Sequence, residues 1–430
     1  MATLKRALGR WDLTAIGVNQ VIGGSIFLLP SQVAITFGPW SPIAVAAMGL
    51  VSLSVALCFA ELASRFDGTG GPYLYTRTAF GNFFGFEVGW MQWFNRAASQ
   101  ASIMAGTTLA FGYYWPAATA GWPRAAIIVV LATALAWVNV RGVRQGAIVI
   151  DTLTIAKLLP LLLFIVAGLT SVDVSRLTAG PVPAPRDALA GALLLIFLYG
   201  GYEVVPVPGG ESLDPRRDVP FALVATILTV TAVMTLTQLV AQGVISDLGA
   251  HTTPVADAAA VLVGASGALL VGAGSIVSMT GNNAGQVLTG ARMIFALAEQ
   301  GELPGWFGRI HPRYHTPANA VLFTSVVATA LALSGSFARL ALVAAIAKLI
   351  MYAGCAAATL ELRRRSHGAQ PPWFVIPGGP TVPAIAFAVS IGIGFGATRE
   401  QLSGGCLGLL AGGLLYVFAP SRQRQLRITN

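Results

Sequence analysis

The organisation of this chain is decided by the stretch Gly17-Val-Asn-Gln-Val-Ile-Gly-Gly-Ser-Ile-Phe-Leu-Leu-Pro30. It lies inside a run from Leu13 to Phe37 that is otherwise apolar and long enough to cross a bilayer, which takes about 20 residues. Glycine and polar residues at mid-depth favour a break, and lipid cannot satisfy the backbone groups that a break exposes. The stretch therefore predicts a discontinuous membrane helix with a polar site at its break. The alternative is a tight helix–helix contact through small residues.

The composition is that of an integral membrane protein. Hydrophobic residues make up 55% of the 430 residues and charged residues only 10%, against about 25% in soluble proteins. The net charge of +9 does not indicate nucleic acid as a partner, because the basic residues lie in short segments between apolar runs. The cysteines Cys58, Cys355 and Cys406 fall in apolar runs and are expected to be small core residues. No metal site or other cofactor is expected.

Twelve apolar runs are expected to form transmembrane helices of a single all-α membrane domain. They are 12–37, 40–64, 83–114, 124–140, 145–170, 187–210, 219–245, 265–298, 318–334, 338–362, 374–397 and 401–419. With the N-terminus inside, 18 of the 26 Lys and Arg residues fall on the cytoplasmic side, 5 fall outside and 3 lie within spans. This excess predicts a multi-pass protein of the cytoplasmic membrane with both termini in the cytoplasm.

A second interruption falls in the sixth run. In Phe197-Leu-Tyr-Gly-Gly-Tyr-Glu-Val-Val-Pro-Val-Pro-Gly-Gly-Glu211, two glycines loosen the helix, and Pro206 and Pro208 each remove a backbone donor. Interrupted segments at matching places in two halves indicate a transporter site built on inverted repeats. The repeats would cover about 12–170 and 187–362, with two further helices over 374–419.

These residues resemble the amino acid–polyamine–organocation (APC) superfamily of permeases. The similar motifs are Ile22-Gly-Gly-Ser-Ile-Phe27, Thr69-Gly-Gly-Pro-Tyr73, Gly201-Tyr-Glu with Glu211-Ser-Leu-Asp-Pro-Arg-Arg-Asp-Val-Pro220, Gly290-Ala-Arg-Met-Ile-Phe-Ala-Leu-Ala298, and Gly301-Glu-Leu-Pro304 with Thr316-Pro317. The resemblance implies the fold of sodium-coupled leucine transporters, with five-plus-five inverted repeats. It also implies a small-molecule substrate, which would be an amino acid or a related amine.

The resemblance also implies a substrate site. Its residues would be Val21, Ile22, Gly23, Gly24, Ser25 and Ile26 in the first break, with Phe197, Tyr199, Gly200 and Gly201 in the second. Backbone N–H groups of residues 23–26 would hold a carboxylate, helped by the positive end of a half-helix. Carbonyl groups near Val21, Ile22, Phe197 and Gly200 would accept from an ammonium group. Phe197 would act as an aromatic gate. Ser25 stands where the family usually has its second glycine.

Lys157 lies in the middle of the fifth run. A lysine at the bilayer centre costs about 2.5–3.5 kcal/mol, so it is expected to face protein or water. It resembles the lysine that replaces a bound ion in sodium-independent family members, and we expect it to be the ion-coupling residue. A proton could leave the buried amine in one conformation and return in the other. The alternatives are a permanently charged lysine in an exchanger without proton coupling, and a structural cation that ties spans 1, 5 and 8.

Other charged residues inside or beside the spans leave alternatives open. Lys348 in the tenth run matches no family motif, and its role stays undecided. Glu203 fits the family pattern but could simply cap broken-helix donors, and Glu87 and Arg96 are expected to form a buried polar network. Residues Glu61, Arg65 and Glu211 border the cytoplasm and could form ion pairs of an inner gate.

Three other functions are alternatives to a transporter. An intramembrane enzyme would need a nucleophile–base or metal motif, and the sequence has neither. A channel would need pore-lining rings rather than paired broken helices. A membrane receptor that binds substrate without moving it is the remaining alternative. The lipid bilayer is an expected partner, nucleic acid is not, and no pattern indicates an oligomeric state.

Overall fold

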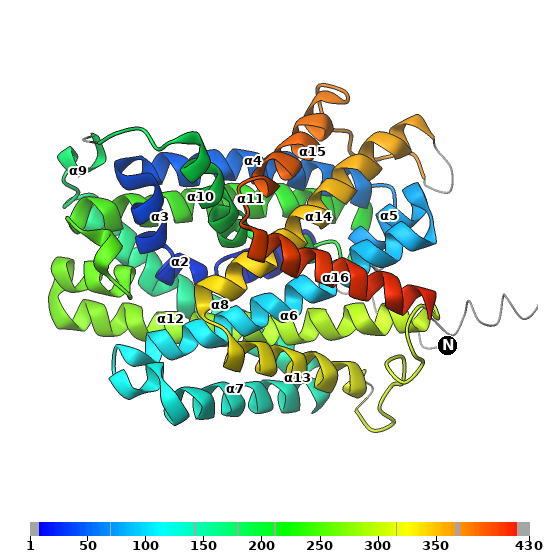
Figure 1. Cartoon of the computed structure of the whole chain (residues 1–430), viewed down its shortest axis with the longest axis horizontal. Helices are drawn as coiled ribbons and strands as arrows, with labels where there is room; N and C mark the ends of the chain where they lie inside the picture. The colour runs from blue at the N-terminus through cyan, green and yellow to red at the C-terminus, as the bar shows by residue number, and fades with distance from the viewer. Residues whose placement is uncertain are drawn as a thin grey trace, which may run out of the picture.

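The fold is all-helical. A computed structural model describes residues 8–68, 70–141, 143–178, 180–209, 212–314, 316–365 and 370–418, with only the backbone for 143–155 and 178. Over these ranges it contains helices and turns but no strand; Leu8 and Ser212 form one isolated bridge. The predicted all-α class is therefore confirmed (Figure 1).

Helices occur at each of the twelve predicted runs. They are α1 (Arg10–Val21), α2 (Ser25–Leu28), α3 (Pro30–Phe37), α4 (Ser41–Ala63), α5 (Pro72–Phe80), α6 (Asn82–Gly112), α7 (Gly121–Arg141), α8 (Val143–Leu169), α9 (Ser175–Thr178), α10 (Pro185–Tyr199), α11 (Pro215–Val244), α12 (Pro254–Glu299), α13 (Ala318–Ser334), α14 (Phe337–Arg364), α15 (Thr381–Gly394) and α16 (Arg399–Val417). Short 3-10 turns connect several of them, including η3 (Tyr202–Val204) after α10.

Five helical segments in the described ranges are long and apolar enough to cross a bilayer unaided. They are Pro30–Ala63, Gly121–Arg141, Pro215–Val244, Pro254–Glu299 and Phe337–Arg364. The pair α15 and α16, bent by 119°, passes the same test together. Helices α1 and α10 are too short to pass it, with 12 and 15 residues, because the polypeptide leaves the helix where the two interruptions were predicted.

The structure differs from the prediction in several places. Helix α12 starts at Pro254 rather than 265 and is kinked at Val263 and Gly264, where Gly264 has a φ of +73°. Helix α15 starts at Thr381 rather than 374, because prolines and positive-φ glycines fill the segment before it. Helix α5 was not predicted. Cys58 and Cys355 are buried as expected, but Cys406 is exposed on α16.

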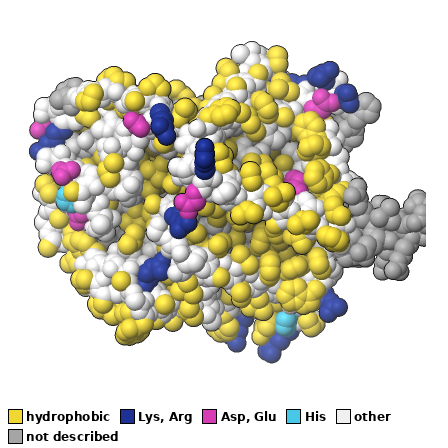
Figure 2. Space-filling model, in the orientation of Figure 1, with side chains coloured by type: hydrophobic (Ala, Val, Ile, Leu, Met, Phe, Trp, Pro, Cys, Tyr) yellow, Lys and Arg dark blue, Asp and Glu magenta, His cyan; other side chains and the backbone are white. Residues whose placement is uncertain are grey.

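Long helices pack in pairs around the interrupted segments. Helix α4 packs on α11, α6 packs on α12 and α14, α8 packs on α12, and α7 packs on α13. In Figure 1, α4 and α11 lie along the upper side, α7 and α13 along the lower side, and α15 and α16 in front. Large hydrophobic areas cover the face in Figure 2, as expected of a surface that contacts lipid.

Candidate functional site

The first interruption lies between α1 and α2. Helix α1 ends at Val21, and α2 begins at Ser25. The N–H of Gly23 donates to the Val21 carbonyl at 2.8 Å, so it is not free to hold a ligand in this conformation. By contrast, none of the hydrogen bonds among the described residues uses the N–H groups of Gly24, Ser25 or Ile26. The break therefore presents unsatisfied donors deep inside the protein, where an anionic group would satisfy them.

The second interruption touches the first one directly. Helix α10 ends at Tyr199, Gly200 is extended, and Gly201 adopts a φ of +141° that favours glycine. A methyl group at Gly201 would lie 2.5 Å from the carbonyl carbon and oxygen of Gln20 in α1. The two broken segments thus meet backbone to backbone, and this contact requires glycine on both steric and conformational grounds.

A buried carboxylate fixes the second break. Glu203 accepts four hydrogen bonds, which come from Arg96 (2.5 Å), the Gly201 N–H (2.8 Å), the Tyr352 hydroxyl (3.1 Å) and Asn95 (3.4 Å). The expectation that Glu203 could cap broken-helix donors therefore agrees with the geometry at Gly201. Its ion pair with Arg96 additionally joins α6 to the break, because both side chains are almost fully buried.

Arg96 belongs to a buried polar network, as expected, but Glu87 is not part of that network. Arg96 pairs with Glu203 instead and donates to the Gln286 side chain at 3.0 Å. Neither carboxylate oxygen of Glu87 has a hydrogen-bond partner in the described part of the chain. The reason is geometric: Glu87 lies nine residues before Arg96 on α6, next to Gly412 of α16, whereas Arg96 lies at the level of the break.

Lys157 of α8 binds the first break. Its ammonium group donates to the carbonyl oxygens of Asn19 (2.8 Å) and Ile22 (2.6 Å) and to the Asn19 side chain. From α12, the Ser278 hydroxyl donates to the Gly23 carbonyl at 3.2 Å. Spans 1, 5 and 8 are thus joined around one fully buried ammonium. The Ile22 carbonyl is used here, so it is not available to a substrate in this conformation.

A cavity of about 10 Å³, room for about one water molecule, lies between the two breaks in this conformation. Its lining consists of Gln20, Val21, Gly23, Ser25, Ser99, Ile103, Phe197, Gly200, Asn282, Gln286 and Lys348. The structure thus brings five of the ten predicted substrate residues to one cavity. Ser25, which departs from the family motif, is among them.

The other five predicted substrate residues do not line this cavity. Gly24 packs against Met279 of α12, and Gly201 packs against Gln20. Tyr199 is directed to α4, where its hydroxyl donates to the Val45 carbonyl at 2.8 Å. Tyr199 follows Phe197 by two positions, about 200° around a helix, so the two side chains leave α10 on nearly opposite sides. Ile22 and Ile26 are also absent from the lining.

The prediction missed the contribution of α12 and α14. Asn282 donates to the Gln20 carbonyl at 2.8 Å, and a methyl at Gly23 would lie 2.7 Å from its side-chain nitrogen. Lys348, whose role the sequence left open, places its ammonium 5.0 Å from the centre of the Phe197 ring and 4.0 Å from Glu203. The only sequence signal for these residues is polarity inside an apolar run, because neither helix is broken there.

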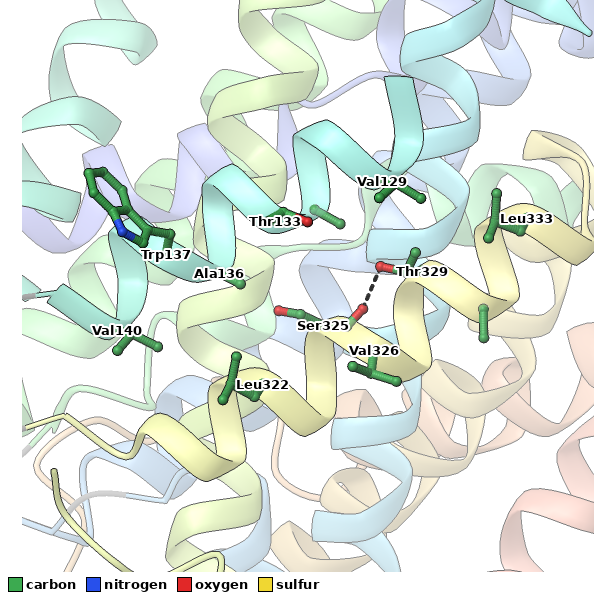
Figure 3. Close-up of a pocket in the computed structure, with 12 residues that line it drawn as sticks. Val129, Thr133, Ala136, Trp137, Val140, Leu322, Ser325, Val326, Thr329 and Leu333 are labelled. Atoms are coloured by element: carbon green, nitrogen blue, oxygen red, sulfur yellow. Dashed lines mark hydrogen bonds between the residues drawn. The ribbon is translucent and has the colours of Figure 1, made fainter. Parts of the chain in front are cut away.

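A groove on the outside of α7 and α13 has a different character. Side chains of α7 and α13 line it, including Val129, Trp137, Leu322 and Val326, and its volume is about 570 Å³ (Figure 3). The Thr329 hydroxyl beside it donates to the Ser325 carbonyl of its own helix at 2.7 Å. The groove carries no charged side chain and does not reach either break, so a polar substrate is not expected to bind there.

Buried ion pairs join the C-terminal ends of α4 and α14. Glu61 of α4 accepts from Arg65 at 3.3 Å and from Arg363 of α14 at 2.7 Å, as well as from the Ile376 N–H at 3.0 Å. The expected pairing of Glu61 with Arg65 is present, and Arg363 adds a partner from a distant part of the chain. The third predicted gate residue, Glu211, lies outside the described residues, as does Thr69 of the second motif.

Two family motifs meet where α5 contacts the loop after α12. Gly71, with a φ of +48°, begins α5, and the hydroxyl of Tyr73 donates to Glu302 at 2.9 Å. Arg77 donates to the Tyr73 oxygen at 2.9 Å. Burial raises the pKa of the Glu302 carboxyl, although Tyr73 and Arg77 favour its charged form. The motif before α6 is thus connected to the loop after α12.

Comparison with known proteins agrees with this architecture. A family model described as "Amino acid permease" matches residues 8–400. The chain belongs to the amino acid permease family. The APC resemblance is therefore confirmed, and with it the assignment to a family of multi-pass membrane transporters.

Relatives of this permease cover most of its length. The serine/threonine exchanger SteT of Bacillus subtilis is 30% identical over 90% of each chain. The branched-chain amino acid permease BcaP of the same organism is 25% identical over 89% of this chain and 86% of its own. The arginine/ornithine antiporter of Pseudomonas aeruginosa is 28% identical over 73% and 68%. The names of these relatives cover neutral and cationic amino acids.

Proposed function

We propose that this permease is a secondary transporter that moves an amino acid or a related amine across the cytoplasmic membrane by alternating access. The observation that carries the proposal is the meeting of two broken helices around one buried cavity. Binding at the middle of the membrane between two such helices is the arrangement from which alternating access operates. The family and the printed activities of its relatives support the same function.

The proposal includes twelve spans in two inverted repeats, followed by α15 and α16. Helices α4, α6 and α7 are the second to fourth spans of the first repeat, and α11, α12 and α13 are their counterparts. Each helix packs directly on its counterpart, as expected when a pseudo-twofold axis passes between the halves. The basic residues of the cytoplasmic loops support termini on the inner side.

The substrate carboxylate would bind the free N–H groups of Gly24, Ser25 and Ile26. Since the Gly23 N–H is used by Val21 in this conformation, we propose that it becomes available only if the break opens further. Phe197 would cover the bound substrate, because its ring borders the cavity. The hydroxyl of Ser25 would offer one more hydrogen bond than the family's usual glycine.

Transport is proposed to be independent of sodium. The Lys157 ammonium is bonded to the carbonyl oxygens of Asn19 and Ile22, so a sodium ion there would be both redundant and repelled. In one version, Lys157 loses its proton during the cycle, and transport is coupled to protons. In the other version, it stays charged, and the protein exchanges amino acids without proton coupling. The contact supports either version, because both need the amine beside the break.

Uptake by purified protein in proteoliposomes tests the proposal. Labelled amino acids of neutral, acidic and basic types would be tested in turn; at least one type should accumulate relative to protein-free liposomes, and its uptake should persist when sodium is replaced by choline. Stimulation by an inward proton gradient supports the first version, and uptake only against internal amino acid supports the second. Lys157→Ala should impair both. Substrate binding without uptake would make the protein a receptor, and strict sodium dependence would refute the role of Lys157.

A further inference from the structure

Lys348 is a buried cation at the cavity with no hydrogen-bond partner. Its side chain is 3% exposed, and it lines the space between the two breaks. In the described part of the chain it forms no hydrogen bond; its polar contacts are Glu203 at 4.0 Å and the Phe197 ring at 5.0 Å. An ammonium group has three donors, and a buried charge without hydrogen bonds is costly. The free donors of Lys348 therefore face a cavity that would have to widen, as the break opens, before a ligand could reach them.

The neighbouring carboxylate does not satisfy this ammonium. Glu203 already accepts four hydrogen bonds, the shortest from Arg96 at 2.5 Å, and its charge is balanced by that guanidinium. The third buried cation, Lys157, is bonded to Asn19 and Ile22. The break region thus holds three cations and one carboxylate, and the cation that remains without hydrogen bonds is the one that reaches the cavity.

Lys348 also fills the place where the substrate amine would lie. A methyl group at Gly200 would lie 1.5 Å from the Lys348 nitrogen, so this ammonium rests against the second break beside the Phe197 ring. A second ammonium there would meet a like charge in a site of low dielectric constant. A substrate carboxylate would instead form charge-assisted hydrogen bonds with the Lys348 donors.

We propose that Lys348 determines specificity by binding a second carboxylate of the substrate, so that the permease selects dicarboxylic amino acids. One carboxylate would bind the free N–H groups of the first break, and the side-chain carboxylate would bind Lys348. The substrate amine would have to lie away from Gly200, on the side of the Asn282 and Gln286 amides. Basic amino acids would be rejected by Lys348. This inference rests on the proposed transport function and narrows its substrate class.

Isosteric pairs of amino acids test the charge preference in the unmodified protein. Ligand-induced thermal stabilisation in detergent and competition for uptake in proteoliposomes would be measured with L-glutamate against L-glutamine and L-aspartate against L-asparagine. The acids should bind about 10- to 100-fold more tightly than the amides, the range for a hydrogen bond to a charged group. L-Lysine should not compete. Equal affinity for acid and amide would overturn the inference.

A pair of variants on α14 separates specificity from structure. Lys348→Met removes the ammonium and keeps a long apolar side chain, so the acid-to-amide affinity ratio should fall to near one. Arg339→Gln is the control, because it removes a positive charge from the same helix at an exposed position paired with Glu400. It should keep the ratio of the unmodified protein. A merely structural Lys348 would weaken every ligand equally and leave the ratio unchanged, which would also refute the proposal.

Failure of the inference can be distinguished from failure of the proposed function. If the unmodified protein binds and takes up amides and acids with equal affinity, the proposed transport function stands, but the proposed role of Lys348 is refuted. If no amino acid binds or is taken up, the proposed function falls, and the inference with it. If Lys348→Met does not reach the membrane, the affinity ratios of the unmodified protein still decide the substrate class.

Discussion

The ion pair between Arg96 and Glu203 offers the most direct test of the centre of this permease. Glu203→Gln keeps the shape of the side chain and removes its charge. An amide oxygen can still accept from Gly201 or Tyr352, but the amide nitrogen cannot accept from Arg96. The guanidinium, which is only 1% exposed, is then buried without a counter-ion.

The expected cost follows from that burial. Breaking a buried ion pair by removing one partner costs about 3–5 kcal/mol, because the other charge stays uncompensated. Domain stabilities are about 5–15 kcal/mol, so Glu203→Gln is expected to remove a large share of the total. Loss of negative charge also brings Lys348 and Arg96 into unscreened repulsion, which adds to the cost. Arg96→Gln should be similarly destabilising, because the Glu203 carboxylate loses its guanidinium partner. The nearest remaining cation, Lys348, is 4.0 Å away and donates no hydrogen bond to it.

A double-mutant cycle measures the interaction separately from the desolvation of each partner. Equilibrium unfolding in mixed micelles would be compared for Glu203→Gln, Arg96→Gln and the double variant. Removing both charges leaves neither one unpaired, so the double variant should be more stable than the sum of the single effects predicts, by about 3 kcal/mol. Additive effects within about 0.5 kcal/mol would refute a direct ion pair and the reasoning built on it.

Two further predictions concern the contact between the breaks and the ion pair between Glu61 and Arg363. Gly201→Ala should lower the free energy of unfolding by about 1–3 kcal/mol through backbone strain and by a similar amount through steric overlap, and it should abolish uptake. The control Gly392→Ala should be neutral, because nothing lies within 4 Å of the added methyl. A melting temperature of Gly201→Ala equal to that of the unmodified protein would contradict the contact. Arg363→Gln should destabilise the protein by about 1.5–3 kcal/mol, because the hydrogen bonds from Arg363 to Glu61 are lost. The neighbouring Arg364 is exposed, so the control Arg364→Gln should change the stability by at most about 1 kcal/mol. Equal effects of these two variants would contradict a stabilising ion pair between Arg363 and Glu61.

Local patterns predicted the positions of the helices and of both interruptions. Apolar length marked each span, and clustered glycine, proline and polar residues marked the breaks, because both signals depend on a few neighbouring residues. The predicted start of α15 is wrong, because the run from 374 is apolar enough to resemble a span. Its prolines and positive-φ glycines nevertheless exclude a helix before Thr381. Likewise, α5 was missed because its nine residues are too few to give a clear pattern.

The sequence predicts only the part of the site that the two interrupted segments themselves contribute. Val21, Gly23, Ser25, Phe197 and Gly200 belong to the breaks themselves, and these residues line the cavity. Tyr199 was misassigned because adjacency in the chain does not give the direction of a side chain on a helix. Asn282, Gln286 and Lys348 come from unbroken helices that reach the cavity only through tertiary packing. Nothing in their local sequence distinguishes a cavity-facing polar residue from a structural one.

The backbone contact between Gly201 and Gln20 has a consequence for how such permeases diversify. A contact made by main-chain atoms does not depend on which side chains surround it, provided that the glycine stays bare. The side chains around the cavity can therefore change during evolution without moving the two segments apart. Permeases that share about one identical residue in four can keep the same contact between the breaks and still bind different substrates. Main-chain atoms hold the two segments together, whereas side chains determine which substrate binds.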